Sequence, residues 1–526
     1  MRPGSFLSLR ELSLGILVIA LVSRVIAVPS PLVHGPEASF QPKFAPDASR
    51  LAFVSTLPDL VTNDTNGRVL DVFVLELSSG ITKLVSARSD GTGSGDGPSY
   101  APQFITGGTA VLFESRTENL VTNDSNGRAD VFLRDLLSGQ TLLLSTNRFG
   151  VGANGNSLHP RASSDGRRVV FQSQATDLTS TLDANGRDDL FLLDLNAGTT
   201  TIVNTNRLRQ PGTNGAAEPF ISADGEFVVF RSASLDLVQS PASGYVTDLY
   251  LRRTDNGRID MLRAITNGGR QTVPVLNPIM ASGTNQLACI LNGQAGFGTP
   301  VGTFRFDLPT GGTLSHGIGS STNLTSFRIS NLAGPVISAD GAVIAVEGLT
   351  GTGAAVRRGL FVWRPGSGDP VEVVADSLPR DNANFFHSPV LAANGSRIAA
   401  LHSSRVLMVF NADGTMAGGP FPADDWSAPA LSNDGRLVAF HTLLPNAPGQ
   451  PATQGLFLID LDVAPVRLDI RTAAGGVEIS WTGGDGYVLE SADVLGGGWQ
   501  PVAGVSGSKV ELPLAGGGKF FRLHKP

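Results

Sequence analysis

The hydrophobic and polar positions of this chain follow one arrangement that recurs eight times. Each copy begins with a proline and a short apolar stretch, passes through a tight turn that usually reads Asp-Gly, and continues as an apolar run. The copies begin at Pro42, Pro102, Pro160, Pro219, Pro278, Pro335, Pro389 and Pro429. Successive prolines lie 60, 58, 59, 59, 57, 54 and 40 residues apart. A period of this size is typical of solenoids, propellers and repeat arrays.

The second half of each copy selects among these architectures. Segments such as 71–77 (DVFVLEL), 130–136 (DVFLRDL) and 189–195 (DLFLLDL) alternate or run apolar, which is a strand period rather than a helix period. In most copies a further short strand follows a turn that contains glycine, as at 83–86 (KLVS) and 141–145 (TLLLS). Each copy therefore predicts four antiparallel strands, which is the blade of a β-propeller.

The repeated pattern P-x-F-[SA]-x-D-G-x-x-[VIL]-[AV]-F resembles the repeat of TolB-like, WD-like bacterial β-propellers. The resemblance implies an all-β chain with a propeller over residues 40–463. The repeat count gives eight blades, or seven if a degenerate copy, such as the one at Pro278 or Pro389, is absorbed into a neighbour. Members of this group serve as translocation partners, sugar or peptide binders, substrate gates of proteases and occasional lyases, so the fold alone does not fix the function.

The amino-terminal residues 1–27 differ in composition from the repeats. Arg2 and Arg10 precede an apolar run at 12–22, and residues 25–27 read Val-Ile-Ala. This order is typical of a secretory signal peptide that is cleaved after Ala27. The alternative, an uncleaved anchor, is disfavoured because the run is too short to cross ~30 Å of hydrocarbon. We therefore expect a signal peptide at 1–27, a linker at 28–39 and no membrane span in the mature chain.

The carboxy-terminal residues 464–526 follow the last repeat and contain strand-like runs that are separated by Gly-rich turns. A small core could be built from Trp481, Tyr487, Trp499, Phe520 and Phe521. The segment predicts a small β-sandwich, and it is similar to a carboxy-terminal module of secreted proteins from some environmental bacteria. The alternative is a cap that covers the last edge of the propeller.

Composition and motifs exclude several classes of function. The chain carries a net charge of −7 without a basic cluster, which argues against nucleic acid as a partner. It has no G-x-S-x-G elbow, H-E-x-x-H motif, Walker-type loop or dinucleotide fingerprint. A serine hydrolase, a zinc hydrolase and a nucleotide-binding enzyme are therefore disfavoured.

One candidate site lies in the loop before the third strand of the first three repeats. These loops read NDTNGRVLDVF from Asn63, NDSNGRADVF from Asn123 and LDANGRDDLF from Leu182. Ca²⁺ prefers about six to eight oxygen ligands around a turn that contains glycine. The candidate ligands are Asp64, Asn66, Asp71, Asp124, Asn126, Asp130, Asp183, Asn185 and Asp189. The alternative is an Asn-Gly turn followed by an aspartate that hydrogen-bonds the backbone at the start of the strand.

The other candidate site is the central funnel. The resemblance implies that the residue before each repeated proline lies near one mouth of the channel. A ligand would enter there, because the polar side chains of different blades converge at that end. The candidate residues are Gln41, His159, Glu218, Asn277 and, one position further back, His387. His159 and Glu218 come from adjacent blades and could bind a metal or act as an acid and a base. The alternative is that strand ends around any funnel are polar.

Together these observations predict a secreted or periplasmic, non-catalytic propeller that acts as a binding scaffold. Its partner would be an envelope or extracellular protein, or a glycan. The alternative is a propeller-type polysaccharide lyase or hydrolase with its site in the funnel. Calcium is the one cofactor that the sequence suggests.

Overall fold

The computed structural model describes about seven tenths of the chain, including nearly all of the first four repeats. The described residues are 41–58, 60–239, 248–262, 264–266, 271–273, 275–292, 301–308, 335–350, 357–364, 371–375, 386–423, 429–444, 453–462, 467–473, 476–482, 488–492, 500–505, 507–513 and 520–524. Within these ranges the chain is built from antiparallel strands, with one 3₁₀ turn (Thr106–Gly108) and no α-helix. No helix in them has the length and hydropathy of a membrane span.

The first four blades each contain four antiparallel strands in chain order. They are β1 (Lys43–Phe44), β2 (Arg50–Ser55), β3 (Asp71–Glu76) and β4 (Thr82–Leu84); β5 (Ser99–Ile105), β6 (Ala110–Ser115), β7 (Asp130–Asp135) and β8 (Thr141–Leu143); β9 (Ser157–Ala162), β10 (Arg168–Ser173), β11 (Asp189–Asp194) and β12 (Thr199–Ile202); β13 (Ala217–Ile221), β14 (Phe227–Ser232), β15 (Asp248–Arg253) and β16 (Ile259–Leu262).

The last four blades follow the same order. They are β19 (Val275–Met280), β20 (Gln286–Asn292) and β21 (Val301–Asp307); β22 (Val336–Ile337), β23 (Ile344–Thr350), β24 (Arg357–Trp363) and β25 (Val371–Ala375); β26 (Phe386–Leu391), β27 (Arg397–His402), β28 (Val406–Asn411) and β29 (Met416–Pro422); β30 (Ala430–Leu431), β31 (Leu437–Leu444) and β32 (Thr453–Asp460). In the described residues the fifth and eighth blades thus show three strands each. A separate hairpin, β17 (Ala264–Thr266) and β18 (Gln271–Val273), which the repeat pattern does not predict, lies between the fourth and fifth blades.

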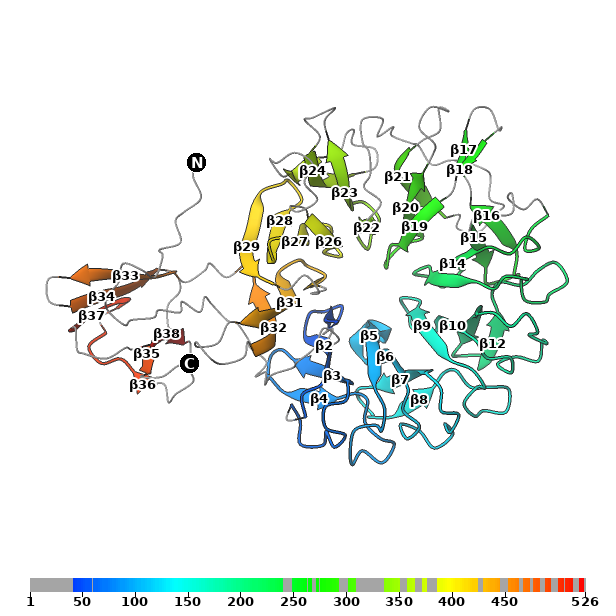
Figure 1. Cartoon of the computed structure of the whole chain (residues 1–526), viewed down its shortest axis with the longest axis horizontal. Coiled ribbons are helices and arrows are strands. Elements are labelled where there is room, and N and C mark those ends of the chain that lie inside the picture. Colours follow the sequence, from blue (N-terminus) through cyan, green and yellow to red (C-terminus); the bar gives the residue numbers. More distant parts are fainter. Residues whose placement is uncertain are drawn as a thin grey trace. The chain divides into compact units, whose positions relative to one another are not determined.

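The eight sheets form a ring in chain order (Figure 1). The first strand of each blade lies against strands of the preceding blade, and β1 of the first blade lies against β30 of the last, so the ring is closed. The prediction of an all-β propeller is confirmed, and the eight sheets among the described residues agree with the eight blades of the repeat count. Each of these eight sheets consists of consecutive strands.

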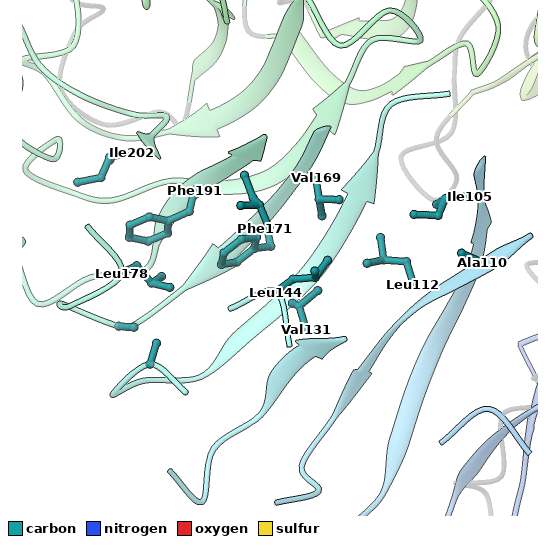
Figure 2. Packing of buried hydrophobic residues seen from close by; sticks show 13 residues of the cluster. Ile105, Ala110, Leu112, Val131, Leu144, Val169, Phe171, Leu178, Phe191 and Ile202 are labelled. Carbon is teal, nitrogen blue, oxygen red and sulfur yellow. The ribbon is translucent and has the colours of Figure 1, made fainter. Parts of the chain in front are cut away.

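The hydrophobic core lies between the blades rather than in one central mass. The cluster in Figure 2 joins Leu112 and Val131 of the second blade to Val169, Phe171 and Phe191 of the third. Equivalent clusters join the first blade to the second and the third to the fourth. The second strand of each blade therefore reads as an apolar run rather than an alternation, because neighbouring blades bury both of its faces.

The predicted Asp-Gly turns join the first and second strands of a blade. In the third blade Ser163 Oγ donates to Asp165 Oδ1 (2.5 Å) and accepts from the backbone N–H of Arg168 (3.0 Å). Gly166 adopts a φ of 71°, which glycine reaches without steric cost. The same Ser-x-Asp-Gly network recurs at Ser222, Ser338 and Ser432.

These turns also connect neighbouring blades. The backbone N–H of Ser164 donates to Ala223 O at 2.9 Å, that of Ala339 to Ala393 O at 2.7 Å, and that of Asn394 to Asn433 O at 3.0 Å. At the junction of the last and first blades, Asn433 Nδ2 donates to Pro46 O at 2.8 Å. We call this series of contacts the turn belt. It ties the hairpins together on one side of the ring.

Replacing Asn433 with alanine is expected to lower the free energy of unfolding by about 1 kcal/mol, because a typical hydrogen bond contributes about that much. Asn433→Asp, which keeps the size of the side chain and removes the donor, should cost at least as much. Denaturant titration of both variants measures the effect. Stability equal to that of the original chain in both would show that the last and first blades are held by strand packing alone.

The carboxy-terminal sheets form a second group. One sheet has the order β33 (Arg467–Ala473), β34 (Gly476–Thr482) and β37 (Lys509–Pro513), and the other β36 (Gln500–Pro501), β35 (Val488–Ala492) and β38 (Phe520–His524). Ile479, Val510 and Leu489 are buried and come from both sheets, as in the small β-sandwich that was predicted. The chain divides into two compact units within β32, between Leu456 and Phe457. The predicted boundary at 463/464 lies outside the described residues.

Candidate binding sites on the inner strands and in the blade loops

The first strand of each blade is an edge strand that faces the centre of the ring (Figure 1). A proline in a sheet is confined to such edges, because it has no N–H to donate to a neighbouring strand. All eight repeated prolines are buried. The repeated proline is therefore tolerated because it lies in the inner edge strand of its blade.

The residue before the proline lies in a β-bulge, a feature that the sequence does not predict. Ala101, His159, Glu218 and Ser388 have φ values of 53°, 54°, 54° and 50°. The strand register shifts at the same place in each of their blades. A left-handed backbone at a residue other than glycine costs on the order of 1–3 kcal/mol, so neighbouring groups must hold it.

Side chains of the preceding blade hold two of these bulges. The backbone N–H of Ala101 donates to Gln41 Oε1 at 3.0 Å, and that of His159 donates to Glu114 Oε1 at 2.9 Å. Gln41, a predicted ligand-binding residue, is therefore occupied by a structural contact. Glu114, which is only 9% exposed and lies on β6, was not predicted.

The predicted acid–base pair is not assembled. Glu218 instead forms an ion pair with Arg231, at 3.1 Å between Oε1 and Nη1. The side chain of His159 is exposed, and no hydrogen bond or ion pair joins it to Glu218 in the described part of the chain. Asn277 and His387 belong to β19 and β26, but their side chains lie outside the described residues.

The position after the proline brings together residues that the sequence analysis missed. It holds Lys43, Gln103 and Arg161 in the first three blades. The later blades carry Phe220, Ile279 and Val336 there, and these three pack against the cores between blades. The sequence shows this change from polar to apolar residues after the proline, and a comparison of the repeats at that position would have indicated the site.

The two cations at this position are poorly compensated. Both Lys43 and Arg161 can be reached by solvent, but protein atoms surround them on most sides. Desolvation, and then the charge of Arg161, lowers the pKa of Lys43. Desolvation also lowers the pKa of Arg161, although the carboxylate of Glu114 opposes this. Lys43 has no ion-pair partner in the described residues, so an acidic ligand would relieve the repulsion between the two cations.

The candidate calcium loops share one geometry in three blades. The amide of the loop asparagine bridges the carboxylate at the start of the third strand and a backbone carbonyl. In the first blade Asn66 Nδ2 donates to Asp71 Oδ2 and to Gly95 O, both at 2.8 Å. Asn126 Nδ2 reaches Asp130 Oδ2 (2.7 Å) and Ala153 O (2.8 Å), and Asn185 Nδ2 reaches Asp189 Oδ2 and Gly212 O (both 2.8 Å).

The other oxygen of each strand-opening aspartate is also hydrogen-bonded. Asp71 Oδ1 accepts from Ser86 Oγ at 2.6 Å, Asp130 Oδ1 from Ser145 Oγ at 2.5 Å, and Asp189 Oδ1 from Asn204 Nδ2 at 2.5 Å. Ser86 and Ser145 Oγ accept from the N–H of Val72 and Val131, so each network ends on the backbone. These contacts agree with the turn alternative in part, although side chains mediate them.

The first aspartate of each loop is less well satisfied. Asp124 and Asp183 are each 5% exposed. Asp64 Oδ2, Asn66 Oδ1 and both carboxylate oxygens of Asp183 are buried without a hydrogen-bond partner among the described residues. Burial raises the pKa of Asp64, Asp124 and Asp183. Burial also raises the pKa of Asp71, Asp130 and Asp189 to about 7 in each case.

The donor set limits what these loops could hold. The described residues contain no group of three or more His, Cys, Asp or Glu side chains that is arranged to hold a metal ion. A cation here would rely on two carboxylates, with carbonyl, amide or water oxygens to complete its shell. Such a set of oxygens suits a hard cation rather than zinc or copper.

Solved structures similar to this chain include several β-propellers. They include TolB from Acinetobacter baumannii (14% identity, TM-score 0.32, 70% of this chain and 62% of that one), an oligogalacturonate lyase in complex with manganese (13%, 0.38, 80% and 89%) and the Dos1 propeller (11%, 0.45, 83% and 96%). The alignment thus spans less than two thirds of TolB. No family model and no curated protein sequence matches the chain. The assignment of the fold rests on the sheets themselves, and none of these proteins lends its role to this chain.

Proposed function

We propose that this protein is a non-catalytic binding propeller that works outside the cytoplasm. Its partner is an envelope or extracellular protein, or a glycan. The partner presents an acidic group to the inner strands of the first three blades. The observation that carries this proposal is the pair of mutually repelling cations, Lys43 and Arg161, on inner strands of a closed ring. The signal-like residues 1–27 support the location.

The fold suits this role in two ways. Blades that are joined by buried cores and by the turn belt hold the inner strands rigidly, so little conformational entropy is lost when a ligand binds. Lys43 and Arg161 are exposed enough for an acidic group to reach them, and such a group would offset the repulsion between the two cations. Gln103, between the two cations along the ring, adds a neutral donor and acceptor.

The second candidate is a lyase or hydrolase that acts on an extracellular polysaccharide at the same place. The strained backbone of His159, two residues before Arg161, favours it, because such outliers cluster at functional sites. The pairing of Glu218 with Arg231 weakens it, because Glu218 is then not placed to exchange a proton with His159. A lyase would release unsaturated products that absorb in the ultraviolet, whereas a binding protein would not.

Replacing both cations, Lys43→Gln with Arg161→Gln, is expected to weaken the binding of an acidic polymer at least tenfold. The reason is that each hydrogen bond to a charged group contributes about 1.5–3 kcal/mol. Poly-glutamate and polygalacturonate serve as the peptide and glycan probes, and dextran as the neutral one. Titration calorimetry measures affinity, and absorbance of the same mixtures reports any lyase activity.

Arg148→Gln is the matched control, because Arg148 is an exposed arginine of the second blade that contacts Phe149. It should bind both polymers as the original chain does. If the original chain binds neither polymer, or if the double variant binds as tightly as the control, the acidic-ligand proposal is wrong.

A further inference from the structure

We propose that the loops of the first three blades each bind one divalent cation of the calcium class. The cation lies between the first aspartate of the loop (Asp64, Asp124 or Asp183) and the aspartate that opens the third strand (Asp71, Asp130 or Asp189). This inference does not depend on what the inner strands bind.

The third blade carries the argument most clearly. Asp183 is 5% exposed and Asp189 is fully buried. Neither oxygen of Asp183 has a hydrogen-bond partner in the described residues, and its carboxyl group interacts directly with that of Asp189. Two buried carboxylates in contact are unfavourable unless a proton or a cation lies between them. A cation between Asp183 and Asp189 would relieve this repulsion and give the oxygens of Asp183 a partner.

The chemistry of this place selects the cation. Asp183 offers two oxygens, and Asp189 Oδ2 can bind a cation while it still accepts from Asn185 Nδ2. Two carboxylates balance the charge of a divalent cation. All of the available ligands are oxygen atoms, which Ca²⁺ prefers, and exposed neighbours such as Gly186 and Arg187 leave room for waters that complete the shell.

The other two blades repeat the arrangement with local differences. In the first blade Asp64 Oδ2 and Asn66 Oδ1 are buried without a partner in the described residues. In the second blade Glu118 and Asp96 add negative charge at Asp124. Gly152 packs closely against this loop, because a Cβ there would come within 2.7 Å of both Asp124 Oδ1 and Asn126 Nδ2.

The expected stoichiometry is three. The corresponding stretch of the fourth repeat, 240–247, lies outside the described residues, and its sequence retains only the strand-opening Asp248. Elemental analysis of the full chain, purified without chelator and dialysed against micromolar calcium, should therefore find about three equivalents of calcium. Calcium should also raise the melting temperature of the chelator-treated protein.

Asp183→Asn is the decisive variant. It keeps the shape of the side chain but replaces one carboxylate with an amide that can donate to Asp189. The variant should bind about two equivalents of calcium, and in chelator it should melt above the original chain because the repulsion is gone. The control is Asp165→Asn, which changes an aspartate of the same blade in the Asp-Gly turn; it should keep about three.

Two results would overturn the proposal. One is a melting temperature of the original chain that is the same in calcium and in chelator, together with no bound calcium. The other is a calcium content that Asp183→Asn leaves unchanged. Loss of acidic-polymer binding leaves both readouts intact, so failure of the proposed function and failure of the cation sites can be told apart.

Discussion

Replacing Phe113 with alanine is expected to lower the free energy of unfolding by about 3–5 kcal/mol, the usual cost of deleting a buried aromatic ring. Phe113 is fully buried and lies directly opposite Phe132 on the neighbouring strand. The two rings stack with 5.7 Å between centroids. Equivalent pairs are Phe53–Phe73, Phe171–Phe191 and Phe230–Tyr250. Because Phe113 and Phe132 belong to the core between the first and second blades, the cavity would weaken both the second blade and its contact with the first.

Denaturant unfolding, followed by near-ultraviolet circular dichroism, measures this loss. Phe149→Ala is the matched control, because that ring is 74% exposed and its removal should change the free energy by less than about 0.5 kcal/mol. Phe113→Leu should fall between the two, since it refills part of the cavity. A loss below about 1 kcal/mol in Phe113→Ala would mean that the stacked pairs do not hold the blades together.

In chelator, the chain is expected to lose several kcal/mol of stability as the pH rises from about 4 to about 7. Burial raises the pKa of Asp71, Asp130 and Asp189 to about 7 in the folded chain, whereas an unfolded aspartate titrates near 3.9. The folded state therefore binds more protons than the unfolded state in this window. The contribution is complete below pH 4 and is lost as the pH passes 7.

Melting temperatures in chelator between pH 4 and pH 8 test this dependence. The variant with asparagine at all three positions should show a flatter profile, because an amide does not titrate. Saturating calcium should restore stability most at pH 8, where the carboxylates are charged. A melting temperature that rises steadily from pH 4 to pH 7 in chelator would contradict the raised pKa values.

The sequence predicted the architecture because the signals of a propeller are local and repeated. The proline, the Asp-Gly turn and the apolar run each act within a dozen residues, and eight copies leave little ambiguity. The hairpin β17–β18 was missed because it interrupts the repeat rather than belonging to it. The bulges were missed because they depend on side chains of the preceding blade, such as Gln41 and Glu114.

The candidate sites were predictable to different degrees. The contacts between Asn126 and Asp130 and between Asn185 and Asp189 follow from the loop itself, because four residues separate the partners. Their further partners, Ser86, Ser145 and Asn204, were overlooked, although each lies 15 residues after its aspartate. Lys43 and Arg161 were not predicted because the family resemblance places the residue before the proline at the mouth of the channel. The bulge is not visible in the sequence, and the residue after the proline also lies on the inner strand.

The junction of the first and last blades differs from the other junctions of the ring, because the chain does not continue from one of these blades to the other. Each described blade consists of consecutive strands, so among the described residues no strand from one end of the chain completes a sheet at the other end. In the described residues β1 lies against β30, and Asn433 reaches Pro46, but no ladder of backbone hydrogen bonds crosses this junction. Among the described residues, this junction is therefore held by strand packing and a side-chain hydrogen bond rather than by a continuous sheet. Opening the ring at this junction would therefore need no strain on a backbone connection, whereas the chain itself joins every other pair of neighbouring blades.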